Sequence, residues 1–142
     1  MTRVLLMDRQ HIETVVRRWT EAIVTGRLDI FKELLAEDVV DRSVPTPASG
    51  VSGVESIAAR AGAVRAAFAD IRIAVDDLIQ EGDAIAWRWT MTGTHVGPFA
   101  GLAPTNRHAT LRGVNFQRLR GDRVVEHWTL VDVFGALQGL RS

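Results

Sequence analysis

The sequence predicts an α+β fold in which a curved antiparallel sheet forms a cone-shaped barrel wrapped around N-terminal helices and encloses a cavity. In the first half of the 142-residue chain, apolar residues recur with the helical spacing of three or four. In the second half they recur at every second residue, which is typical of strands with one buried face. Helices segregated to one face of an antiparallel sheet form two layers around one core. The length suits one domain, which we expect to span residues 1–142.

The first two expected helices form a hairpin. Residues 8–25 show the i, i+3, i+4, i+7 spacing of a single helix face. The apolar residues of that face are Ile12, Val15, Val16, Trp19, Ile23 and Val24. Asp8 is a suitable N-cap, and Gly26 is a suitable C-terminal stop. A second helix is expected over residues 28–36, and the short connection predicts that the two helices pack against each other.

A short extended piece and a third helix follow. Residues 37–44 are expected to be extended, and the segment 45–50, with its Pro and Gly residues, predicts a break. Residues 52–68 predict a helix, and Ser52 and Glu55 match a capping box at its start.

The rest of the chain is expected to pair as an antiparallel sheet. Alternation predicts strands over residues 71–76, 84–94, 108–119 and 124–134. Tight turns are expected at 81–83 and 120–123. Residues 135–140 are expected to close the chain as a short tail.

The longest expected connection, residues 92–107, has a definite shape. It contains three Gly, which permit positive φ, and two Pro, which fix φ. It also carries Phe99 and Leu102, apolar residues that a fully solvated loop does not need. Such a loop forms either the rim or lid of a pocket or a cap on one edge of the core, and the sequence leaves both interpretations open.

Composition excludes several classes of function. Basic and acidic residues balance at 17 each, which argues against nucleic acid or an anionic membrane as the main partner. The chain has no Cys, so disulfides and zinc–thiolate sites are excluded, and no Tyr, so no phenol serves as an oxyanion donor. No apolar run approaches 18 residues, and the N-terminus lacks the apolar core of a signal peptide. We therefore expect a cytoplasmic protein without a membrane segment.

Asp132 is the first candidate catalytic residue. In a strand over residues 124–134, alternation places it on one face with Glu126, Trp128 and Leu130. Inside a cavity, a carboxylate beside Trp and Leu would be desolvated, and its pKa would rise toward that of a general acid or base. The other interpretation is that this face is exposed and that Asp132 simply ends the strand.

Two further polar residues are candidates. His95 shares its side of the strand with Trp87 and Trp89, so it is either an acid/base or donor in a pocket or a residue that bonds the local backbone. Asn115 lies in mid-strand. A two-residue turn at Gly121 would place Asn115 opposite Trp128, on the same face as Asp132. A change of one residue in turn length would instead place Arg112 and Arg118 of the same strand on that face.

The four Trp residues give either an aromatic wall for a flat ligand or plain core. They are Trp19, Trp87, Trp89 and Trp128. No metal site is expected, because His11, His108 and His127 have no partner at metal-ligand spacing. No phosphate loop, nucleophile elbow or dinucleotide fingerprint occurs.

Separated motifs in a constant order carry a resemblance to a known family. They are residues 67–70, 81–83, 93–95, Gly97, Phe99, 101–102, 104–105, Arg107, 126–128, Asp132 and 137–138. In these the chain resembles the SnoaL-like polyketide cyclases of the nuclear-transport-factor-like superfamily. The resemblance implies a cone fold, a homodimer, a cavity for a small hydrophobic or aromatic polyketide-like ligand, and no cofactor. It also implies ring closure by intramolecular aldol condensation, with Asp132 matching the family's acid/base.

The sequence departs from the family pattern at one position that bears on the chemistry. On the short strand after the second helix, the family commonly has a His that faces the cavity. In this sequence, the corresponding residues 41–43 predict that Arg42 takes that position. Arg42 is therefore expected either to anchor a carboxylate or an enolate of the substrate, or to pair with Asp132 and lower its pKa. With Arg42, the expected ligand-binding residues are Trp19, Trp89, Asn115, Trp128 and Phe99, and the expected catalytic residues are Asp132 and His95.

The favoured function is a cofactor-independent cyclase of polyketide natural-product or antibiotic biosynthesis. The same cavity is also compatible with epoxide opening, dehydration or a cycloaddition steered by shape. A third possibility is a dimer that binds a small molecule without turnover. A site like that of ketosteroid isomerase is disfavoured because the chain has no Tyr.

Overall fold

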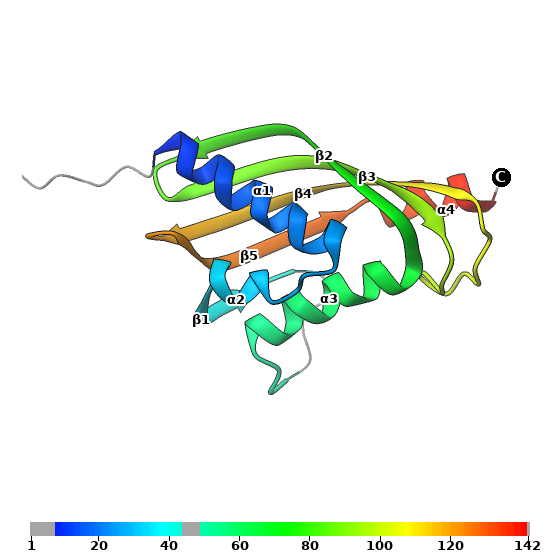
Figure 1. Ribbon diagram of the computed structural model, residues 1–142, viewed down its shortest axis with the longest axis horizontal. Helices are drawn as coiled ribbons and strands as arrows, with labels where there is room; N and C mark the ends of the chain where they lie inside the picture. Colours follow the sequence, from blue (N-terminus) through cyan, green and yellow to red (C-terminus); the bar gives the residue numbers. More distant parts are fainter. Residues whose placement is uncertain (1–7, 44–48, 142) are drawn as a thin grey trace, which may run out of the picture.

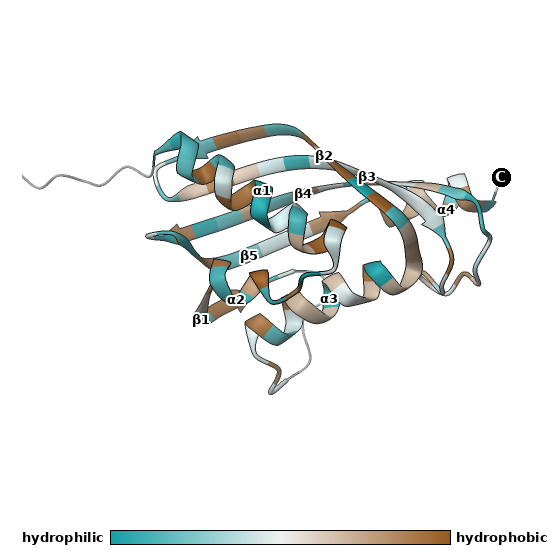
Figure 2. Ribbon diagram, viewed as in Figure 1, coloured by the Kyte–Doolittle hydropathy of each residue, from teal (hydrophilic) through white to brown (hydrophobic). Residues whose placement is uncertain are grey.

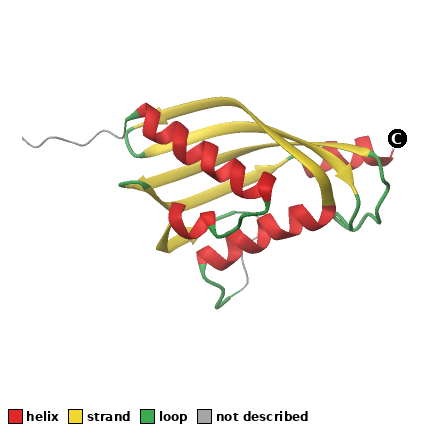
Figure 3. Ribbon diagram, in the orientation of Figure 1, coloured by secondary structure: helices red, strands yellow, loops and turns green. Residues whose placement is uncertain are grey.

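A computed structural model describes residues 8–43 and 49–141 of the chain (Figures 1 and 3). The helices are α1 (Arg9–Thr25), α2 (Ile30–Leu34), α3 (Gly53–Ala67) and α4 (Val133–Arg141). The strands are β1 (Leu35–Asp41), β2 (Phe68–Glu81), β3 (Ala84–His95), β4 (His108–Arg120) and β5 (Arg123–Val131). The predicted α+β fold is confirmed, since α1, α2 and α3 cover one face of a curved sheet.

The predicted helix ends follow from side-chain and backbone capping. The carboxylate of Asp8 accepts a hydrogen bond from the backbone N–H of Gln10, and Gly26 ends α1 with φ of 78°. Arg65 of α3 donates to the last carbonyls of α1, at Ile23 (2.9 Å) and Val24 (3.0 Å), so it satisfies groups that a helix C-terminus leaves free. The hydroxyl of Ser52 accepts from Glu55 N–H at the start of α3, as the capping motif predicted.

The sheet has the order β1-β5-β4-β3-β2. The four long strands pair antiparallel, as predicted, whereas β1 pairs parallel with β5 at the edge. The pairing of β2 with β3 shifts register twice, once near Asp70, whose φ is 54°. Bulges of this kind bend a strand and increase its twist, which accounts for the curvature of the sheet (Figure 1).

Several boundaries differ from the prediction, among them the first long strand, which runs over Phe68–Glu81 rather than over residues 71–76. The second helix ends at Leu34, because Leu35 is drawn into the parallel pairing with β5 opposite Val124. The last strand ends at Val131 rather than at residue 134, and the expected tail is the helix α4, which packs against β4. Most of the expected break at 45–50 lies outside the described residues.

The core consists of two clusters of buried side chains. One joins α1 and α2 to β3 and includes Ile12, Trp19, Phe31 and Trp87, and the other joins Phe68 and Met91 to β4 and α4. Hydrophobic and hydrophilic residues alternate along α1 and the strands, so each buries one face (Figure 2). Within the described residues we find no helix with both the length and the apolar character needed to span a bilayer.

Candidate active site

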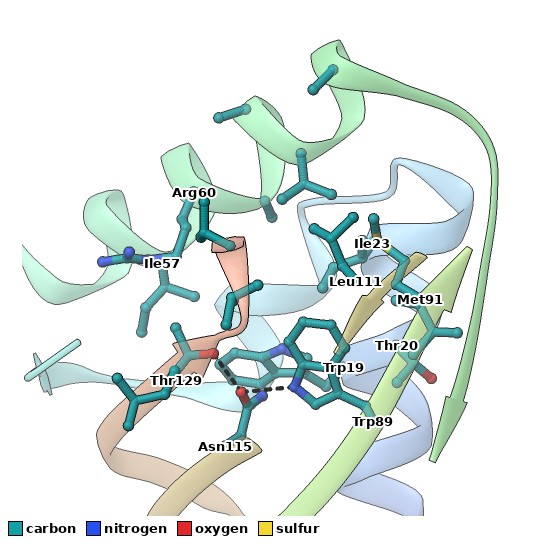
Figure 4. A pocket seen from close by; sticks show the side chains of 18 of the residues that line it. Trp19, Thr20, Ile23, Ile57, Arg60, Trp89, Met91, Leu111, Asn115 and Thr129 are labelled. Atoms are coloured by element: carbon teal, nitrogen blue, oxygen red, sulfur yellow. Dashed lines mark hydrogen bonds between the residues drawn. The ribbon is translucent and has the colours of Figure 1, made fainter. Parts of the chain in front are cut away.

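A cavity of about 510 Å³ lies between the concave face of the sheet and the helices α1 and α3 (Figure 4). Strands β3, β4 and β5 form its floor, and the connection after β3 contributes Pro98, Phe99 and Ala100. Of the two interpretations that the sequence left open, both therefore apply, because the connection forms part of the pocket wall while Phe99 and Leu102 also pack against the second core cluster. Most of the lining side chains are apolar, and residues of both core clusters take part.

Four of the expected ligand-binding residues line this cavity: Trp19, Trp89, Phe99 and Asn115. Trp19 comes from α1 and is held edge-on by Phe31, with ring centroids 4.9 Å apart. Trp89 comes from the middle of β3, on the same side as Trp87 and Met91, which also line the cavity. The aromatic part of the wall thus has two layers, one on a helix and one on the sheet. Trp19 and Trp87 are also buried in the first core cluster, so both interpretations of the Trp residues apply.

Asn115 has a fixed orientation on the floor of the cavity (Figure 4). Its Oδ1 accepts hydrogen bonds from Thr129 Oγ1 at 2.6 Å and from Trp89 Nε1 at 3.1 Å. The indole N–H can only donate, so the amide oxygen of Asn115 must face Trp89. The Asn115 side chain therefore has its NH₂ group left as a donor beside the cavity.

His127 of β5 also lines the cavity and was not among the expected site residues. It is 3% exposed, and its ring packs on Trp19 with centroids 4.7 Å apart. Burial lowers the pKa of His127 from 6.5 to about 4, although the negative charge of Asp41 acts in the opposite direction. The imidazole is consequently neutral at pH 7.

Arg60 of α3 lines the cavity as well, and it forms an ion pair with the buried carboxylate of Asp41. Arg60 Nη2 lies 3.3 Å from Asp41 Oδ2, and Asp41 also accepts from Ser56 Oγ and from the Ser43 N–H. Burial alone would raise the pKa of Asp41, but these hydrogen bonds and the positive charge of Arg60 hold it below its usual value. Asp41 is therefore an ionised partner of Arg60.

The prediction that Trp128 shares the cavity face of the last strand is wrong. The pairing of β4 with β5 shifts by one residue, because Leu119 faces Val124 while Arg118 faces Glu126. This bulge inverts β5 from Glu126 onward, so Thr129 rather than Trp128 lies opposite Asn115. Trp128 instead packs on the exposed Phe116 across the outer face of the sheet, with ring centroids 5.1 Å apart.

The predicted position of Arg42 in the cavity is also wrong. Asp41 and Ser43 are buried, and Arg42 between them points outward, with half of its side chain exposed. Arg42 Nε lies 2.8 Å from Glu126 Oε2, and the guanidinium lies over the ring of Trp128 at 5.8 Å. Of the two expected roles, pairing with Asp132 does not occur, because Glu126 is the partner.

Asp132 lies outside the strand in which it was predicted. It is exposed, and its Oδ1 accepts from the Gly135 N–H at 2.8 Å, which is the geometry of an N-cap for α4. The adjacent Val131 and Val133 line the cavity, but the Asp132 side chain is not part of the lining. Among the described lining residues there is no carboxylate, and the titratable ones are Arg60 and His127.

His95, the second expected catalytic residue, is fully buried at the end of β3, outside the cavity lining. Its Nδ1 accepts from the Thr105 N–H at 3.2 Å and lies 3.0 Å from Thr105 Oγ1. Nε2 has no hydrogen-bond partner in the described part of the chain. The rings of Phe68 and Phe99 pack around it. His95 therefore anchors the 92–107 connection, which was the alternative that the sequence left open.

Sequence reasoning missed His127, Thr129 and Arg60. His127 belongs to the quoted 126–128 motif, but the alternation placed it and Thr129 on the far face of the strand. Arg60 follows Ile57 at helical spacing and could have been found as a charge on the apolar face of α3. In the described residues, no three His, Asp or Glu side chains are grouped as a metal site would require.

Comparison with known proteins gives a consistent result. The family model for SnoaL-like polyketide cyclases matches residues 13–140. IdmH of Streptomyces antibioticus, a proposed polyketide cyclase, is 31% identical, with a TM-score of 0.78 over 92% of this chain and 98% of that one. A search of curated proteins finds no match.

Two other solved structures share the fold. TsrD of Streptomyces laurentii has a TM-score of 0.84 at 22% identity, over 94% of this chain and 97% of that one. AclR of Streptomyces galilaeus, a proposed hydroxylase, has a TM-score of 0.81 at 24% identity, over 94% of this chain and 83% of that one.

Proposed function

Because the chain belongs to the SnoaL-like polyketide cyclase family, we propose that it closes a ring in a polyketide natural product by an intramolecular aldol-type condensation. The observation that supports this most is the make-up of the cavity wall. The wall is mostly apolar and aromatic, and the sheet side also presents the polar groups of Asn115, Thr129 and His127. An apolar cavity with a few convergent polar groups is the usual form of a small-molecule site.

The proposed reaction needs folding of the substrate and stabilisation of an anion. A base, here Asp132 or solvent water, takes a proton from a carbon next to one carbonyl. That carbon bonds to the carbon of a second carbonyl, and the oxygen of the second carbonyl takes up a proton. Holding the two carbons together can contribute up to ~10 kcal/mol, which suits an apolar cavity with few catalytic groups. The NH₂ of Asn115 and the positive charge of Arg60 are the groups that would stabilise an enolate oxygen.

The acid/base role of Asp132 remains a hypothesis drawn from the resemblance. Its carboxylate is exposed, so a substrate would have to extend past Val131 and Val133 to reach it. Asp132→Asn tests this role, because Asn is an equally good N-cap and leaves α4 in place. We expect a loss of ~10²–10⁴ in rate, which is typical of a lost general base, whereas a change within about threefold would rule out this role for Asp132.

The proposal can be tested by fluorescence titration with flat tricyclic and tetracyclic polyketides, since Trp19, Trp87 and Trp89 line the cavity. We expect saturable quenching and slow product formation in the wild type, with binding retained and product reduced in Asn115→Leu. Binding without product would instead favour a non-catalytic binding protein. The absence of quenching by every compound would contradict the aromatic wall as a ligand site.

A second candidate is ring closure steered by shape alone, for example a cycloaddition. The observation in its favour is that the described lining residues include no carboxylate that could take a proton. The two reactions differ in an exchange experiment in D₂O with a substrate that binds but cannot close. An aldol catalyst would accelerate exchange of the proton next to the carbonyl, and a purely shape-steered catalyst would not.

The remaining expectations are part of the same proposal. We propose that the chain acts as a homodimer without a cofactor, in the cytoplasm, on a small hydrophobic or aromatic ligand rather than on nucleic acid or a membrane. The resemblance supports the dimer and the absence of a cofactor, and the balanced charge of the sequence supports the choice of ligand.

A further inference from the structure

Two rows of hydrogen-bonded side chains cross the concave face of the sheet from β3 through β4 to β5, and in both rows residues at the ends line the cavity. In the first row, Trp89 and Thr129 both donate to Asn115. In the second row, Trp87 Nε1 donates to Gln117 Oε1 at 3.0 Å, and Gln117 Nε2 lies 3.1 Å from His127 Nδ1. Gln117 is fully buried, and Trp87 and His127 are 2% and 3% exposed. In each row, an indole N–H donates to the oxygen of a side-chain amide and thereby fixes the orientation of that amide.

The direction of the second row follows from the donor inventory. An indole nitrogen can only donate, so Gln117 must turn its oxygen toward Trp87 and its NH₂ toward His127. Nδ1 of His127 then has to accept, because a proton on it would set two donors against each other at 3.1 Å. A neutral imidazole whose Nδ1 accepts carries its proton on Nε2.

We propose that Gln117 is a positioning residue that holds His127 as a neutral imidazole with its proton on Nε2. The Nε2–H of His127 is then a hydrogen-bond donor for a ligand in the cavity. The cavity therefore selects a ligand with a carbonyl or ionised enol oxygen rather than one with a hydroxyl donor. Asn115 has the same polarity, since its oxygen is already occupied by two donors. This inference rests on the proposed function only for the kind of ligand, and not for the state of His127.

The surroundings of His127 agree with a neutral ring. Trp19 from α1 covers one face at 4.7 Å, and the charged groups nearby are Asp41 of β1 and Arg60 of α3. The carboxylate favours a second proton and the guanidinium opposes it, while burial outweighs both and lowers the pKa to about 4. A ring in this state cannot serve as a base, because Nδ1 already accepts from Gln117 and Nε2 carries the proton.

The test is ¹⁵N NMR of the histidine rings in the ligand-free protein, with His127 assigned by its loss in His127→Gln. We expect His127 to show an unprotonated Nδ1 and a protonated Nε2, unchanged from pH 8 to about pH 5.5. A protonated Nδ1 anywhere in this range would overturn the proposal, and so would a fast exchange of both tautomers. This result is independent of whether any ligand binds.

Gln117→Glu supplies a second readout, because a carboxylate accepts where the amide donates. We expect this change to raise the pKa of His127 by more than about one unit, and Gln138→Glu on the exposed side of α4 to leave it unchanged. An unchanged pKa of His127 in a folded Gln117→Glu protein would count against a positioning role. If that variant does not fold, the wild-type spectrum still decides.

Alizarin, a flat tricyclic diketone with ionisable hydroxyl groups, is a suitable probe of ligand selection. Its colour changes on ionisation, so a donor wall should make bound alizarin ionise at a lower pH than free alizarin. We expect His127→Phe, which keeps a ring beside Trp19, to remove part of this shift. Binding of neutral alizarin in both proteins would refute the donor role, whereas no binding alongside the expected NMR spectrum would refute the proposed ligand class instead.

Discussion

The buried neutral state of His127 predicts a loss of stability in mild acid. Its pKa is about 4 in the folded protein and 6.5 in an unfolded chain, so between these values the unfolded state binds more protons. Stability is therefore fully present above about pH 6.5 and falls as the pH drops toward 4. A difference of about 2.5 units at 1.36 kcal/mol per unit corresponds to about 3 kcal/mol.

His127→Leu removes this contribution and serves as the perturbation. The leucine leaves the NH₂ of Gln117 without its acceptor, which costs about 1–3 kcal/mol, but that cost is the same at every pH and cancels in the comparison. Asp41 does not interfere above pH 4.5. Its pKa is lowered, so the stability it contributes is lost only as the pH falls below its unfolded value of 3.8.

Urea unfolding followed by Trp fluorescence at pH 7.5 and pH 4.5 measures the effect. We expect the wild type to lose about 2–3 kcal/mol more than His127→Leu over this range, which corresponds to about 1–2 M in the urea midpoint. His108→Gln, at an exposed histidine, should follow the wild type. Equal losses in the wild type and His127→Leu would refute the conclusion that burial keeps this ring neutral.

Three further predictions concern other parts of the site and surface. Asn115→Leu should reduce ring closure by ~10²–10³, as expected for a lost oxyanion donor, in a single-turnover assay with a substrate that the wild type converts. Arg42→Ala should leave ligand quenching unchanged and lower stability by less than about 1 kcal/mol in urea unfolding, because its ion pair with Glu126 is on the surface. A loss of ligand binding in that variant would restore Arg42 as a site residue. Leu130→Arg should convert a homodimer into a monomer in sedimentation, because Leu130 is 64% exposed on the outer sheet face; a monomeric wild type would contradict the dimer.

The order of helices and strands could be predicted from local sequence alone. Helical spacing over residues 8–25, the capping motif at Ser52 and the switch to alternation depend on neighbours within one or two turns of chain. The extent of the last strand could not, because residues 133–141 are as apolar as a strand and Asp132 is as suitable for a strand end as for a helix cap. Only packing against β4 decided that they form a helix.

Which residues line the cavity depended on the register between β4 and β5, and no local sequence pattern predicts that register. The sequence by itself identified a shaped connection at residues 92–107, as either a pocket rim or a cap on the core, and it identified Trp19, Trp89 and Asn115 as candidates to line a pocket. The tertiary structure decided which face of β5 turns inward. One unpaired residue, Val125, shifts the register by a single position, and because side chains alternate with a period of two, that shift exchanges Trp128 for Thr129 and brings His127 into the cavity.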